Sequence, residues 1–300
     1  MDRDGAPPVS RPKKTTGGPY AKLVVNADEF GLFPDVSTGI ITAHRDGIVT
    51  STSVLGNTDD LPDASRLLRE NPTLGVGIQL CLIRGRPVTH PNDVRTLLAA
   101  HGGFPEHARE VFGAWLGGRL RQVEIEREFA AQVERALAAG LAPDHLDTQH
   151  HLGFLPPVGL ALEATAQRFG ILGVRSAAEK PTLTWVTELP RGALAALMGG
   201  LSWMTRRKMG TLRHGPESHG YVESGQLDEV RILEILGRLG PGSHELICHP
   251  GESDDARPGL GPLPGTRFRR ARELAALTSP VVKQAVRRRN LQLCRWSDLF

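Results

Sequence analysis

The chain is poor in cysteine, and this shortage excludes two kinds of small, cross-linked protein. Its 300 residues include three cysteines, Cys81, Cys248 and Cys294, which lie far apart and form no CxxC pair. An odd number of widely spaced cysteines supports neither a disulfide framework nor a zinc knuckle. We therefore expect a protein of the reducing cytoplasm.

The net charge is small, and long apolar runs are missing. Lys and Arg number 36 against 33 Asp and Glu, and a net charge of +3 is too small to predict binding to nucleic acid or to a membrane surface. No run has the length of a membrane-spanning helix, and residues 1–19 lack the apolar core of a secretory signal. We therefore expect residues 1–19 to form a flexible tail. We also expect the substrate to be a small molecule.

Short apolar runs alternate with helical patterns along the rest of the chain. Residues 22–32 indicate a buried strand that stops at Asp28, Glu29 and Gly31, and residues 36–45 follow with helical spacing. Further strands are expected at 48–55, 74–82, 173–175, 244–251 and 291–296, and further helices at 60–70, 122–140, 158–169, 194–204, 227–239, 271–277 and 281–289. Residues 88–121 indicate a loop with short helical pieces. This order predicts a parallel α/β fold, in one barrel-like domain over residues 20–300.

Polar side chains gather where several of these strands are expected to end. Asp28 and Glu29 follow the first strand, a second cluster occupies residues 143–157, and His249 ends a late strand. In barrels and open α/β sheets, the loops at the carboxyl ends of the strands usually carry the chemistry. The sequence therefore predicts a site built from these clusters.

Five blocks of sequence resemble the YdjC/ChbG carbohydrate deacetylases, and most closely their HpnK-like branch. The blocks are VNADEFGL at 25–32, GIVTSTS at 47–53, NPTLGVGIQL at 71–80, HLDTQHH at 145–151 and CHPG at 248–251. The resemblance runs in order from about residue 22 to the end of the chain. It implies a single deformed (β/α) TIM-like barrel, and metal-assisted removal of an acetyl group from an N-acetylated amino sugar.

The chain departs from this family where the metal should be held. By resemblance, Asp28 stands at the position of the general base, and Glu29 at that of an aspartate that binds the metal. Gln79 and Gln149 stand where the family has ligand histidines, and Gly153 replaces a further histidine. The inherited metal positions are thus Glu29, Gln79 and Gln149, and all three have changed.

The substituted residues are poor ligands for a zinc-type ion. Glutamine offers an amide oxygen, a weak, hard ligand, and Glu29 is one methylene longer than aspartate. We therefore expect no cofactor. A divalent metal would need His150 or His151 as a replacement ligand, and adjacent residues of a regular strand face opposite ways, so at most one of them could point inward.

What remains is an acid–base pair, Asp28 and His249, which we expect to be catalytic. We expect Glu29, Gln79, Gln149, His151 and Arg175 to bind substrate, with His145 and Asp147 supporting them from behind. Arg175 has two interpretations of equal weight, since it could bind an anionic or hydroxyl-rich substrate or pair with Glu179.

Three functions follow from this pattern. The first is metal-independent acid–base chemistry on a small carbonyl-containing or glycosylated metabolite, in specialised metabolism. The second is a true metal-dependent N-acetyl sugar deacetylase with a rebuilt site, and the third is a non-catalytic binding protein. Retention of both Asp28 and His249 argues against the third, because a pure binder needs neither. Base rates alone favour a homodimer.

Overall fold

The computed structural model describes residues 20–175, 213–254 and 268–300, with single helical positions between 193 and 205. The expected tail over residues 1–19 lies outside the described residues, as do five of the eleven residues of the helix expected at 194–204, whose other six positions are helical. Glu179, one of the two partners considered for Arg175, also lies outside the described residues.

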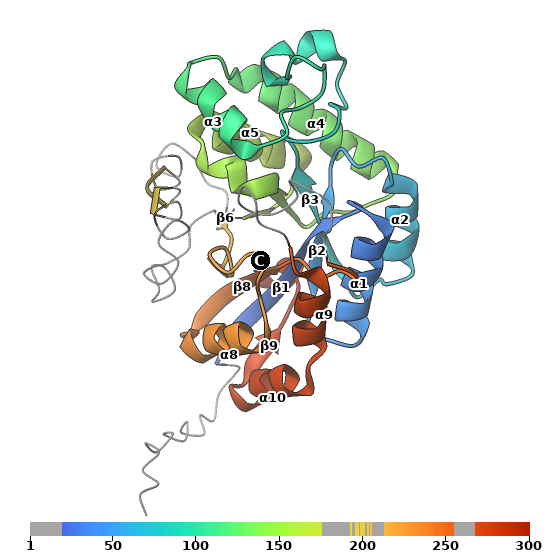
Figure 1. Ribbon diagram of the computed structural model, residues 1–300, viewed down its shortest axis with the longest axis vertical. Coiled ribbons are helices and arrows are strands. Elements are labelled where there is room, and N and C mark those ends of the chain that lie inside the picture. The colour runs from blue at the N-terminus through green and yellow to red at the C-terminus, as the bar shows by residue number, and fades with distance from the viewer. Residues whose placement is uncertain are drawn as a thin grey trace, which may run out of the picture.

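In the part of the chain that the structure describes, nine strands form one sheet in which every pairing is parallel (Figure 1). They are β1 (Ala21–Phe30), β2 (Ser51–Leu55), β3 (Gly75–Leu80), β4 (His145–Thr148), β5 (Gly173–Val174), β6 (Arg213–His214), β7 (Glu217–His219), β8 (Gly242–Cys248) and β9 (Leu291–Leu293). Their spatial order is β6-β5-β4-β3-β2-β1-β8-β7, with β9 also paired to β1. The sheet is that of a deformed α/β barrel, as the sequence predicted.

Helices connect the strands and cover the outside of the sheet. The α-helices are α1 (Pro34–Arg45), α2 (Leu61–Arg69), α3 (Ala108–Leu116), α4 (Gln122–Ala138), α5 (Pro156–Phe169), α8 (Glu229–Arg238), α9 (Arg270–Thr278) and α10 (Pro280–Arg288). The 3-10 helices are η1 (Pro91–Asp93), η2 (Arg95–Leu97), η3 (Gln149–Phe154) and η4 (Trp296–Leu299). In Figure 1, α3, α4 and α5 lie together near one end of the sheet, and α8, α9 and α10 near the other.

Residues 88–121 form a largely irregular insertion with short helices, as expected, and buried side chains of α4 bind its first part. Glu128 accepts hydrogen bonds from the backbone N–H groups of Val88 and Thr89, at 2.9 and 3.0 Å. Glu124 accepts one from the N–H of Thr96 at 2.7 Å. The strongly amphipathic pattern of α4 therefore serves both the core and this loop.

Two strands are shorter than the sequence suggested because their ends bond elsewhere. The strand expected at 48–55 begins only at Ser51, since the N–H of Val49 bonds to the carbonyl of Ala43 in α1. The strand expected at 244–251 ends at Cys248, because the N–H of His249 bonds to a side chain of α9.

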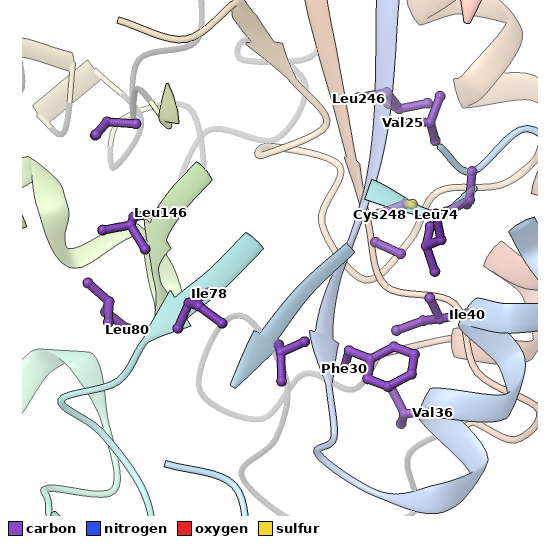
Figure 2. Packing of buried hydrophobic residues seen from close by; sticks show 14 of the residues in the cluster. Val25, Phe30, Val36, Ile40, Leu74, Ile78, Leu80, Leu146, Leu246 and Cys248 are labelled. Carbon is purple, nitrogen blue, oxygen red and sulfur yellow. The ribbon is translucent and has the colours of Figure 1, made fainter. Parts of the chain in front are cut away.

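The outer face of the sheet carries the apolar core. Successive strand residues point to opposite faces, so every second residue faces the helices. Val25, Ile78, Leu146 and Leu246 belong to this outer set and are fully buried in the main hydrophobic cluster. Figure 2 shows them with Phe30 at the end of β1 and with Val36 and Ile40 of α1.

Many of the alternate residues of the same strands are polar. This inner set comprises Asn26 and Asp28 of β1, Ser53 of β2, Gln79 of β3, His145 and Asp147 of β4, and Glu245 of β8, each at most 2 % exposed. Buried polar groups are costly unless they bond to one another, so this face must form a connected network. The functional site is built on that network.

No helix in the described part of the chain is both long enough and apolar enough to cross a membrane.

Candidate active site

Asp28 is the centre of the inner network. Its two carboxylate oxygens accept hydrogen bonds from both terminal nitrogens of Arg175, each at 2.7 Å. The side-chain amides of Gln79 and Asn26 add two more donors, at 2.8 and 2.9 Å. Burial alone would raise the pKa of Asp28, but the adjacent guanidinium of Arg175 holds that pKa well below its usual range. Asp28 is therefore a firmly ionised carboxylate.

Arg175 is the cation that makes this burial tolerable. Besides Asp28, it donates from Nε to Glu245 at 2.9 Å and lies 3.3 Å from a carboxylate oxygen of Asp147. It follows β5, and its backbone N–H continues the ladder by bonding to Leu146. The structure thus directs this guanidinium toward three carboxylates of the network. Substrate binding by Arg175, one of the two roles considered, stays a prediction.

The pKa of Asp147 is shifted in the opposite direction to that of its neighbour Asp28. Asp147 accepts hydrogen bonds from Gln79 at 3.0 Å and from the hydroxyl of Ser53 at 2.5 Å. Burial and the nearby charge of Asp28 raise the pKa of Asp147 to about 6, and Arg175 offsets this only in part. The pair therefore contains one carboxyl that stays ionised and one that can take up a proton near neutral pH.

His145 lies behind Asp147, on the side remote from Arg175. Its Nδ1 lies 2.7 Å from a carboxylate oxygen of Asp144, and its Nε2 lies 3.1 Å from the hydroxyl of Ser53. The ring stacks on Trp296, with centroids 4.6 Å apart and planes within 9°. This geometry is consistent with the supporting role predicted for His145.

Glu29 turns away from Asp28 into a separate ion pair. Its backbone has a φ of 70°, a left-handed conformation that is uncommon outside glycine and redirects the side chain. The carboxylate binds Arg270, which is itself completely buried. Burial would raise the pKa of Glu29, but Arg270 and then His249 lower it overall. Glu29 thus already has a cationic partner from the protein.

His249 approaches Asp28 from the neighbouring strand. Ala27 and Cys248 are paired in register, so Asp28 and His249 are the next residues of β1 and β8. Burial lowers the pKa of His249, against the opposing charges of Asp28 and Glu29, so its ring is neutral. Its Nδ1 is buried and bonds to no group in the described part of the chain.

Gln79 and Gln149, which the resemblance places at metal positions, each have a buried amide oxygen. The Gln79 amide nitrogen faces the carboxylates of Asp28 and Asp147, an orientation fixed because carboxylates only accept. Its oxygen is buried and lacks a hydrogen-bond partner among the described residues, as does the amide oxygen of Gln149. These two acceptors are available to a ligand.

The expectation that His150 and His151 lie on a regular strand is wrong. β4 ends at Thr148, and both histidines have left-handed φ angles, 51° and 56°, within η3. The ring of His151 meets that of Tyr221 edge-on at 5.0 Å. Burial lowers the pKa of His150 to about 4 and that of His151 to about 3. The argument from alternating strand faces therefore does not apply to them.

The residues present do not fit the divalent metal that the resemblance implies. Glu29 is engaged by Arg270, and Gln79 directs its nitrogen, which cannot bind a cation, toward the carboxylates. Among the residues that the structure describes, no three His, Cys, Asp or Glu side chains gather closely enough to hold a metal ion. The donor set is therefore unsuited to a zinc-type centre.

Comparison with known proteins places the chain in a family. A family model described as YdjC-like protein matches residues 22–288, almost the whole length. The chain belongs to the YdjC-like family. This confirms the resemblance and the assignment to a family of enzymes.

Relatives in this family match over nearly their full length. A carbohydrate deacetylase of Geobacillus stearothermophilus is 31% identical over 92% of this chain and 97% of its own. A chitooligosaccharide deacetylase of Yersinia enterocolitica is 29% identical over 92% and 98%. The crystal structure of a putative cellobiose-phosphate cleavage protein from Enterococcus faecalis is similar with a TM-score of 0.73, at 25% identity over 93% of this chain and 98% of that one.

Several residues of the site were not identified from the sequence. Ser53 and Glu245 could have been found from the alternation of strand residues, because their side chains face the inside of the sheet. Asn26, Gln79 and Asp147 face the same way. Arg270, Glu273, Phe268 and Trp296 carried no such signal, since they come from helices or loops remote in sequence. Their roles depend on contacts that only the folded chain brings together.

Proposed function

We propose that this YdjC-like protein is an enzyme whose inherited metal site has been dismantled and whose pocket performs metal-independent acid–base chemistry. Asp28 and His249 are the catalytic groups, and the substrate is a small carbonyl-containing or glycosylated metabolite of specialised metabolism. The observation that carries the proposal is the ion pair of Glu29 with Arg270, because it engages the carboxylate that a metal ion would need.

The neutral ring of His249 supports its role as the group that moves a proton. With a buried, unpartnered Nδ1 among the described residues, the imidazole can accept a proton from a bound substrate and return it. Asp28, firmly ionised, stabilises the imidazolium that forms. Proton transfer by a positioned side chain is worth typically 10² to 10⁴ in rate.

Such a site suits a substrate that needs less activation than an amide. An activated ester, a hemiketal, an enolisable ketone or a cyclisation precursor would qualify, because an acid–base group can assist each of these reactions without a metal ion. The unpartnered amide oxygens of Gln79 and Gln149 would accept hydrogen bonds from substrate hydroxyl groups, with Glu29, His151 and Arg175 completing the binding site. We propose a cytoplasmic homodimer that acts on neither nucleic acid nor a membrane.

The names of the relatives suggest a second function, metal-dependent removal of acetyl groups from amino sugars. It would require a rebuilt site, for which the unpaired amide oxygens of Gln79 and Gln149 and the two histidines near Glu29, His150 and His249, are candidate ligands. We favour the first function because the guanidinium beside Glu29 opposes a second cation at the same carboxylate.

One experiment separates the two. The purified protein is analysed for metals, and acetate release from an N-acetylglucosamine oligomer is measured before and after chelator treatment. The proposal predicts no stoichiometric metal and no chelator-sensitive acetate release. Stoichiometric zinc with chelator-sensitive release would establish the deacetylase instead.

A further inference from the structure

We propose that Arg270 and Glu273, at the start of α9, are positioning residues that fix His249 and Glu29 at the ends of β8 and β1. The inference rests on the proposed catalytic role of His249, but it concerns residues to which that role assigned nothing. The two side chains lie one helical turn apart, so they project from the same face of α9 toward the sheet.

Glu273 holds the backbone of His249 where the sheet no longer can. The paired register of β1 and β8 ends at Ala27 and Cys248, which leaves the N–H of His249 beyond the ladder. That N–H donates to Glu273 at 2.7 Å, and the second carboxylate oxygen accepts from the N–H of Leu227 at 3.4 Å. Glu273 is completely buried, so it satisfies two donors that water does not reach.

Arg270 holds the other side of the same residue. One terminal nitrogen donates to the carbonyl of His249 at 3.4 Å, and the other binds the carboxylate of Glu29. A single planar guanidinium thus ties the end of β8 to the end of β1. No other side chain could make both contacts with the same fixed geometry.

Phe268 completes the arrangement from two residues before Arg270. Its ring lies 4.6 Å from the ring of His249, centroid to centroid, and the guanidinium of Arg270 lies 4.6 Å from the Phe268 centroid. The segment 268–273 therefore contacts the N–H, the carbonyl and the ring of His249. We call these three residues, Phe268, Arg270 and Glu273, the α9 clamp.

The position of the clamp explains how His249 is oriented with a free ring nitrogen. Catalytic histidines are commonly oriented by a carboxylate or carbonyl bonded to one ring nitrogen, which also fixes the tautomer. Nδ1 of His249 has no such partner in the described part of the chain. Because the clamp fixes the main chain and packs on the ring face, the nitrogen remains available to a ligand.

The test compares clamp variants with a matched variant of the same helix. Arg270→Met removes the bridge, Arg270→Lys keeps the charge without the planar fork, and Glu273→Gln keeps the shape without the charge. Arg272→Met is the control, since Arg272 lies on the same helix, is half exposed and pairs with Asp228 at 2.7 Å. Ring ¹⁵N NMR reports the tautomer and pKa of His249, whose signals are assigned by their absence in His249→Gln.

We expect the ring signals of His249 to move in Arg270→Met and, by less, in Glu273→Gln, while the other histidines keep theirs. Arg272→Met should match the wild type. In any assay that depends on His249, Arg270→Met should lower kcat on the order of 100-fold with little change in KM, because a small displacement of a catalytic group is costly. Arg270→Lys should restore part of this loss.

Unchanged His249 ring signals in both Arg270→Met and Glu273→Gln would overturn the proposal, and so would an equal loss of turnover in Arg272→Met. If Arg270→Met does not fold, Glu273→Gln and Arg270→Lys decide by the same signals. A different result would refute the proposed catalytic function of His249. Full turnover in His249→Ala defeats the acid–base role, whereas inactive His249→Ala with fully active Arg270→Met defeats the clamp alone.

Discussion

The ends of two neighbouring strands hold their functional side chains in opposite ways. At the end of β1, the Asp28 carboxylate accepts four hydrogen bonds from Arg175, Gln79 and Asn26, so its own oxygens are saturated. At the end of β8, His249 is fixed through its main chain, and its Nδ1 is unbonded among the described residues. The difference indicates that Asp28 supplies a fixed charge, while His249 is the group whose proton can be exchanged.

The largest expected effect comes from removing either group. His249→Ala and Asp28→Asn should each lower turnover by a factor on the order of 10² to 10⁴, the typical value of a positioned proton-transfer group. Steady-state kinetics of both variants checks this, with circular dichroism as the control for folding. Asp28→Asn should in addition lose stability, because an amide NH₂ group would face the guanidinium of Arg175. Unchanged rates in both variants would defeat the assignment.

The next largest effect is a loss of stability on removal of Arg175, the cation that binds Asp28. Arg175→Met leaves Asp28, Asp147 and Glu245 buried without their shared partner, and breaking a buried pair in this way costs roughly 3–5 kcal/mol. Urea unfolding measures the change. Arg168→Met is the matched control, because Arg168 and Glu134 are more than half exposed and such pairs contribute at most about 1 kcal/mol. Equal losses of unfolding free energy in the two variants would mean that Arg175 does not stabilise the buried network.

The smallest effect is a pH dependence of stability, to which Glu273 and Asp28 contribute with opposite signs. Burial raises the pKa of Glu273, beside His249, to about 7 from an ordinary value of 4.5. The folded state then holds this proton more tightly than the unfolded state, so stability should fall as pH rises from 4.5 to 7, by roughly 1.4 kcal/mol per pKa unit. Asp28, with its lowered pKa, acts in the opposite sense, and its contribution is lost as pH falls below 3.8.

Unfolding curves across this pH range test the prediction with Glu273→Gln. The variant should show a flatter pH dependence between 4.5 and 7 than the wild type, since its side chain does not titrate. An identical slope in both proteins would show that Glu273 is not the group responsible.

The sequence predicted the barrel and most of its described strands because those signals are local. A run such as Leu23 to Val25 followed by Asp28 and Gly31 specifies a buried strand and its end within one stretch of chain. The residues that face the inside of the sheet were also predictable in principle. Asp28, Gln79 and Asp147 each occupy an inward position in the alternation of their strands.

What the sequence could not supply were the partners. Nothing near Glu29 or His249 indicates Arg270 or Glu273, which lie more than twenty residues away and reach the site only when α9 packs on the sheet. The left-handed turn at His150 and His151 was also missed, because neither residue is a glycine and the preceding strand pattern suggested continuation. Local patterns thus predicted which polar residues lie at the strand ends, and tertiary contacts determine their electrostatics.

We propose that this YdjC-like chain has exchanged its metal site for ion pairs, and calorimetric titration with Zn²⁺ tests this exchange. The wild type should show no binding, whereas the combined variant Glu29→Asp, Gln79→His, Gln149→His should gain a measurable site, because it restores two imidazoles and a shorter carboxylate. Tight, stoichiometric zinc binding by the wild type would contradict the account.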